Sequence, residues 1–63
     1  MRRPKTLDIE DGWAECVSAD EHPMRRSCVG LGMMPWLSAA QCRRLAAWLI
    51  QAADWIEAKE EGR

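Results

Sequence analysis

The stretch from Ser38 to Glu60 reads SAAQCRRLAAWLIQAADWIEAKE, and it decides the fold because it is the only long periodic segment in the chain. Ser38 and Gln41 have the spacing of a capping box, in which each side chain bonds the backbone of the other residue. The alanines and leucines that dominate the segment are strong helix formers. We therefore predict one helix over residues 38–60, with Gly62 as its stop signal.

Apolar side chains recur at i, i+3, i+4 and i+7 along this helix, a spacing that is typical of a stripe facing a core. The predicted buried stripe contains Cys42, Leu45, Ala46, Leu49, Ala52, Ala53 and Ile56. Trp48 and Trp55 fall roughly 100–120° to one side of Leu49, so the apolar arc is wider than one small sheet needs.

The two tryptophans allow two interpretations. Either both indoles lie over the edge of the monomer core, or they form a contact surface for another chain, since tryptophan is enriched at interface hot spots. The second interpretation predicts that the partner-binding or dimer residues are Trp48, Trp55, Arg44, Gln51 and Lys59.

The helix charges run against the helix dipole. Arg43 and Arg44 lie near the start, whereas four acidic residues lie between positions 54 and 61. An antiparallel pair of helices would place each basic start beside an acidic end. A chain of 63 residues also buries only about 60% of its unfolded surface, so oligomerisation would support its core. Both observations predict a homodimer.

Two short segments before the helix alternate between apolar and polar residues, which predicts strands over residues 6–9 and 13–18. A third strand is predicted over residues 26–31. A three-residue loop over residues 10–12 is preferred to a two-residue Asp11-Gly12 loop, because it sets Ile9 opposite Trp13. The predicted helix-facing residues are Leu7, Ile9, Trp13, Val17, Val29 and Leu31. The predicted outer face carries Thr6, Asp8, Ala14, Cys16, Ser18, Cys28 and Gly30, and it is either solvated or receives a partner.

These elements predict an α+β fold in two layers, a three-stranded antiparallel meander packed on one long C-terminal helix. Residues 1–63 then form a single small domain. It consists of a flexible basic arm over residues 1–5, a sheet over residues 6–31 and the helix over residues 38–60.

The residues that carry chemistry do not form a recognisable site. Cys16, His22, Cys28 and Cys42 lack the close pairs of a zinc site, so we predict no metal, no cofactor and no catalytic residue. In the preferred register Cys16 and Cys28 are cross-strand neighbours, so a disulfide is geometrically possible, although a reducing cytosol disfavours it.

The net charge of −1 provides no strong field toward nucleic acid or an anionic membrane. No apolar run approaches the roughly 18 residues that a membrane helix needs, and no apolar stretch follows the basic start as in a signal peptide. We therefore expect no membrane association and a cytoplasmic location. A small nucleic-acid-binding regulator stays the alternative function, because the chain still contains clustered arginines.

Residues 36–57, WLSAAQCRRLAAWLIQAADWIE, resemble the C-terminal helix of small phage and prophage accessory proteins, in which a strand-rich start precedes such a helix. Cys42 stands where those helices usually carry alanine. The resemblance implies a non-enzymatic protein-binding module that inhibits a host protein in the host cytoplasm, as anti-CRISPR and other anti-defence proteins do. It transfers no site residues.

Overall fold

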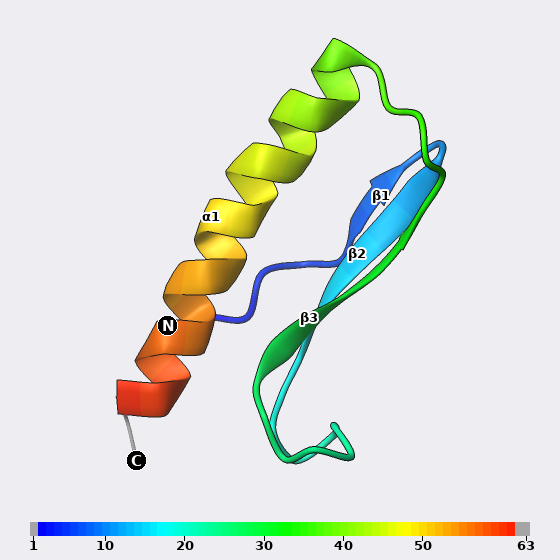
Figure 1. Cartoon of the computed structure of the whole chain (residues 1–63). Coiled ribbons are helices and arrows are strands. Elements are labelled where there is room, and N and C mark those ends of the chain that lie inside the picture. Colours follow the sequence, from blue (N-terminus) through cyan, green and yellow to red (C-terminus); the bar gives the residue numbers. More distant parts are fainter. Residues whose placement is uncertain (1, 62–63) are drawn as a thin grey trace.

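The computed structural model describes residues 2–61, which form three strands followed by one helix (Figure 1). The strands are β1 (Leu7–Ile9), β2 (Gly12–Val17) and β3 (Cys28–Met33), and the helix is α1 (Ala39–Glu61). The sheet is antiparallel in the order β1-β2-β3, and α1 lies along one face of it. The predicted two-layer α+β fold is confirmed, whereas the predicted stop at Gly62 lies outside the described residues.

The start of α1 forms as the sequence predicts. Ser38 Oγ accepts a hydrogen bond from the Gln41 amide at 3.1 Å, and Gln41 Oε1 accepts one from the Ser38 amide at 2.8 Å. This reciprocal pair is the capping box. Gln41 Nε2 also donates to Asp11 Oδ2 at 2.9 Å, so the start of the helix is fixed to the turn between β1 and β2.

The predicted register of the first hairpin is wrong. Ile9 pairs with Gly12 and Leu7 pairs with Ala14, so the loop consists of residues 10–11 and is neither of the two loops considered from the sequence. As a result Ala14 faces the helix, where it is fully buried, and Trp13 faces outward. The physical reason is space, because two indoles of α1 occupy the volume above β2 and leave room only for a small side chain.

Trp13 lies on the outer face of the sheet, over two glycines of β3. It pairs with Gly32, where an added Cβ would stand 2.6 Å from atoms of the indole ring. Glycine at this position therefore lets the ring lie flat on the strand. At Gly30 an added Cβ would be 3.8 Å from the indole, which is ordinary contact.

The second hairpin also differs from its prediction. Cys16 pairs with Val29, and Val17 pairs with Cys28, so the two cysteines lie on opposite faces of the sheet. Cys16 belongs to the core and all three cysteines are free thiols. The third strand begins two residues later than predicted, after a loop in which Arg25 has a φ of 58°.

The core shows that α1 is rotated relative to the predicted stripe. Its buried residues are Ala14, Cys16, Trp48, Ala52 and Trp55. Trp55 is only 1% exposed and Trp48 only 8% exposed. Four predicted stripe residues instead lie on the exposed surface, namely Cys42, Ala46, Leu49 and Ala53. Burying two indoles removes more apolar surface from water than burying alanines, and this favours the observed rotation.

Candidate protein-binding surface

The two tryptophans of α1 pack inside the fold of the single chain. Trp48 Nε1 donates a hydrogen bond to the Lys5 carbonyl at 2.7 Å, and the Trp55 ring lies beneath two cations. The Arg3 guanidinium is 5.3 Å from its centroid and the Lys59 ammonium is 5.6 Å from it, both within cation–π range. The burial supports the interpretation that both indoles belong to the monomer core.

The other predicted partner-binding residues lie on the same side of α1. Arg44 Nη2 donates to the Asp8 carbonyl of β1 at 3.3 Å. Gln51 lines a hollow of about 290 Å³ together with Asp54 and residues 2–5. Contact of these residues with another chain stays a prediction, but Trp48 and Trp55 do not offer a free apolar surface for it.

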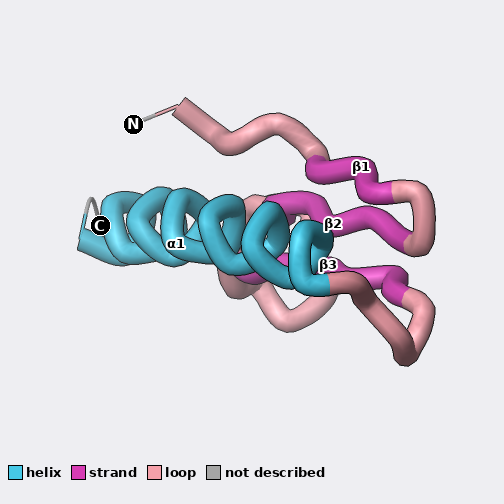
Figure 2. The backbone as a smooth tube through the Cα atoms, turned by 90° about the horizontal axis from the view of Figure 1, so that it is seen from above, coloured by secondary structure: helices cyan, strands magenta, loops and turns pink. Residues whose placement is uncertain are grey.

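Residues 2–5, which we expected to form a flexible arm, run along one flank of α1 in the structure (Figure 2). Arg3 forms an ion pair with Glu21 at 2.9 Å in addition to covering Trp55. Hydrogen bonds from the hydroxyl and amide of Ser18, with the Arg3 contact, lower the pKa of Glu21 to about 2. The segment therefore covers one of the two sides of the helix that the sheet leaves bare.

The opposite flank of α1 is apolar and has no cover within the described chain. We name it the open flank and define it by Cys42, Ala46, Leu49, Ile50 and Ala53, all of which are exposed. Ile50 is the most prominent, with 65% of its surface exposed. Because other α1 side chains bind β1 and the N-terminal segment on the far side of the helix, the open flank faces away from both.

A second exposed apolar feature is the connecting segment, residues 34–36, between β3 and α1. Trp36 is 80% exposed and Met34 is also exposed. The Met34 amide donates to the Asp11 carbonyl at 2.8 Å, Pro35 restricts the backbone, and the helix cap follows at Ser38. The indole of Trp36 is therefore displayed from a backbone that is held at both ends.

Leu31 was assigned to the core by the sequence, yet it is 53% exposed. It pairs with Ala14, so it stands on the helix-facing side of β3. Trp36 begins the run that resembles phage accessory proteins, but it was given no role because it lies outside every periodic segment. Its position in the sequence could have indicated a surface role, because an indole that follows Pro35 and precedes the helix does not belong to the apolar stripe of the helix.

Cys16 and His22, two side chains that could carry chemistry, are held in the core and in a loop, respectively. No group of three or more metal-binding side chains is present within residues 2–61. Burial raises the pKa of the Cys16 thiol, with Arg3 acting in the opposite direction, so little reactive thiolate forms at neutral pH. His22 Nδ1 accepts a hydrogen bond from the Met24 amide at 3.1 Å, a contact within its own loop.

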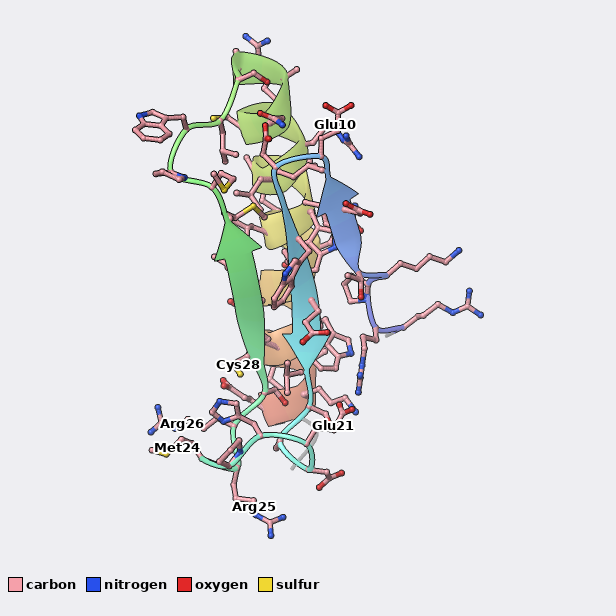
Figure 3. All side chains as sticks on the ribbon, turned by 90° about the vertical axis from the view of Figure 1, so that its right-hand side faces the viewer. Glu10, Glu21, Met24, Arg25, Arg26 and Cys28 are labelled. Carbon is pink, nitrogen blue, oxygen red and sulfur yellow. The ribbon has the colours of Figure 1, made fainter. Side chains whose placement is uncertain are left out.

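The basic residues occupy several places on the fold, and Arg2, Arg3 and Lys5 line one hollow beside α1. Arg25 and Arg26 lie in the loop between β2 and β3, at the end of the sheet away from Glu10, and point in different directions (Figure 3). Arg3 and Arg44 are engaged by Glu21 and the Asp8 carbonyl. Nucleic-acid binding stays a prediction. Within the described residues, α1 lacks the apolar length needed to cross a membrane.

Comparison with known proteins adds no relative. No protein-family model, no curated protein and no solved structure matches this chain. The resemblance to phage and prophage accessory proteins accordingly stays a prediction.

Proposed function

We propose that this chain is a non-enzymatic protein-binding module whose partner contacts the connecting segment. The observation that carries the proposal is the 80% exposure of Trp36 beside the exposed Met34. Tryptophan and methionine are enriched in the cores of protein interfaces, and tryptophan is among the commonest hot-spot residues. An indole that the fold leaves exposed to water provides favourable binding free energy when a partner buries it.

The backbone around Trp36 supports this role because it is already ordered. The Met34 amide is bonded to Asp11, and Gln41 ties the first turn of α1 to the same aspartate. A partner that binds Trp36 therefore has little loop entropy to remove, which favours affinity.

The resemblance of residues 36–57 to phage accessory proteins suggests the nature of the partner. On this proposal the partner is a bacterial host protein, and the chain inhibits it in the host cytoplasm by occluding a surface that the host protein needs. Anti-defence inhibition, including inhibition of CRISPR effectors, is one form of that role. The proposed mechanism uses binding alone and needs no cofactor.

The test is affinity capture from a bacterial lysate with tagged wild-type, Trp36→Ala and Met24→Ala proteins. Met24 is a matched control, because it is an exposed apolar residue in the loop between β2 and β3. We expect one protein to be captured by wild type and by Met24→Ala and to be lost with Trp36→Ala. All three proteins should melt at similar temperatures, since both side chains are exposed.

Two results would contradict the proposal. One is capture that is unchanged by Trp36→Ala. The other is that the wild-type protein captures no protein from the lysates of a range of bacterial species.

A further inference from the structure

We infer that the open flank of α1 binds the open flank of a second copy of this chain, with the two helices antiparallel about a two-fold axis near Ile50. This goes beyond the proposed function, and it uses residues distinct from Trp36 and Met34. Self-association and partner binding can therefore succeed or fail independently.

Four open-flank residues, together with the neighbouring Ile56, have the spacing of a helix-pairing seam. Cys42, Ala46, Leu49, Ala53 and Ile56 follow one another at alternating intervals of four and three residues. This heptad spacing keeps one line of side chains facing a neighbouring helix. The first four are exposed and Ile56 is half-buried, so the seam runs beside the core rather than through it.

The side chains on the seam suit a close approach of two helices. Ala46 and Ala53 are small, and Leu49 stands between them as the one large residue of the exposed part. Ile50 borders the seam on the side away from the sheet, where it remains 65% exposed. Pairing would cover these apolar groups without moving the sheet.

The charges beside the seam select an antiparallel second copy. Arg43 and Glu57 lie one heptad before and one heptad after Ile50, on the same side of the seam. In an antiparallel two-fold pair this side of one helix lies against the same side of the other helix. Arg43 of each copy then lies near Glu57 of the other copy, and the two Ile50 side chains lie near each other. A parallel pair would instead set like charges at the same level.

The sheet is compatible with this arrangement. Because β1 and residues 2–5 occupy the far side of α1, the edge strand on the seam side is β3 (Figure 3). Leu31, exposed on the helix-facing side of β3, then lies toward the second copy. The pairing accounts for an apolar residue that the monomer leaves uncovered.

The size of the seam sets the expected strength. A helix of 23 residues is ~35 Å long, and a strip one helix wide along it buries less than the ~800 Å² per partner of a standard interface. We therefore expect a dimer with a dissociation constant in the micromolar range.

Sedimentation velocity between about 1 and 100 μM tests the inference across that range of affinity. Wild type should shift from monomer to dimer as its concentration rises. Ile50→Glu places two like charges near the two-fold axis of the dimer. It should raise the dissociation constant by roughly tenfold or more. Gln51→Glu is the matched control, because it adds the same charge one residue away on the covered flank, and it should leave the constant unchanged.

A charge exchange tests the register. Arg43→Glu should weaken the dimer, and adding Glu57→Arg to it should restore wild-type association, because the ion pairs mainly fix orientation. A wild type that stays monomeric at 100 μM would overturn the inference. So would a dimer weakened by Gln51→Glu and not by Ile50→Glu, which would place the interface on the Trp48 and Trp55 flank. Trp36→Ala should dimerise normally while losing the captured partner, and this separates the two proposals.

Discussion

The two sides of α1 are both apolar, yet one is buried and the other is open. On the buried side, Trp48, Ala52 and Trp55 lie against the sheet and beneath residues 3–5. On the open flank, Leu49 and Ile50 remain exposed. The comparison shows that apolar character alone does not decide which side of a helix is buried. The size of the side chains and the cover available from the rest of the chain decide it.

The energies explain the choice. A buried indole removes roughly 150–250 Å² from water, which at about 25 cal/mol per Å² corresponds to ~4–6 kcal/mol. An alanine contributes far less. Rotating α1 to bury the alanine-rich stripe would expose both indoles and separate Trp48 from its hydrogen-bond partner, the Lys5 carbonyl.

The largest expected effect is that of Trp55→Ala. This residue is 1% exposed, and removing a buried indole leaves a cavity at the centre of a small core. We expect a loss of ~3–5 kcal/mol in the free energy of unfolding, measured by urea denaturation. In a chain this small, such a loss should leave much of the protein unfolded at 25 °C. Trp36→Ala is the control with the same chemical change at an exposed site. A loss for Trp55→Ala no larger than the loss for this control would contradict the assignment of Trp55 to the core.

A smaller effect is expected for Leu49→Ala on the open flank. A fully buried leucine would lose ~2–5 kcal/mol on truncation, as the sequence-based stripe predicts for this position. Because Leu49 is exposed, we expect a loss of about 1 kcal/mol, measured at a concentration where the chain is monomeric. A loss above ~2 kcal/mol under those conditions would show that the monomer buries this flank after all.

The smallest effect concerns the cover on the buried side, where Glu21 accepts two hydrogen bonds from Ser18 and forms an ion pair with Arg3. The pKa of Glu21 is about 2 in the folded chain and 4.5 without these contacts. Its depressed pKa means that its contribution to stability is present above pH 4.5 and is lost as the pH falls toward 2. Melting temperatures of wild type and Glu21→Gln should therefore differ slightly at pH 7 and converge near pH 2. A difference that is constant with pH would exclude this linkage.

Local signals in the sequence predicted the architecture well. The capping box at Ser38 and Gln41 is specific to a helix start, and it forms as expected. Three short strand-like segments separated by loops were enough to predict an antiparallel meander. These features depend on residues close together in the chain, where backbone propensity dominates.

The register and the rotation of the helix could not be predicted in the same way, because both depend on contacts between layers. The loop over residues 10–11 is selected by which of Trp13 and Ala14 fits under α1, and the sequence of the hairpin does not contain that information. The apolar arc of α1 spans about half the helix, so its periodicity leaves the rotation open. The open flank and the display of Trp36 follow from the rotation and the packing, and could not be predicted before them.

Adjacent alanines provide the most direct test of the central claim, which is that α1 buries its tryptophan side and leaves its other flank free. Ala52 is fully buried and Ala53 is exposed, although the sequence-based stripe would bury both. Urea denaturation of Ala52→Glu and Ala53→Glu, each as monomer, compares the same charge on the two sides. We predict that Ala52→Glu fails to fold or loses more than ~3 kcal/mol, whereas Ala53→Glu stays within ~0.5 kcal/mol of wild type. Equal losses at the two positions, or a larger loss at Ala53, would contradict the account.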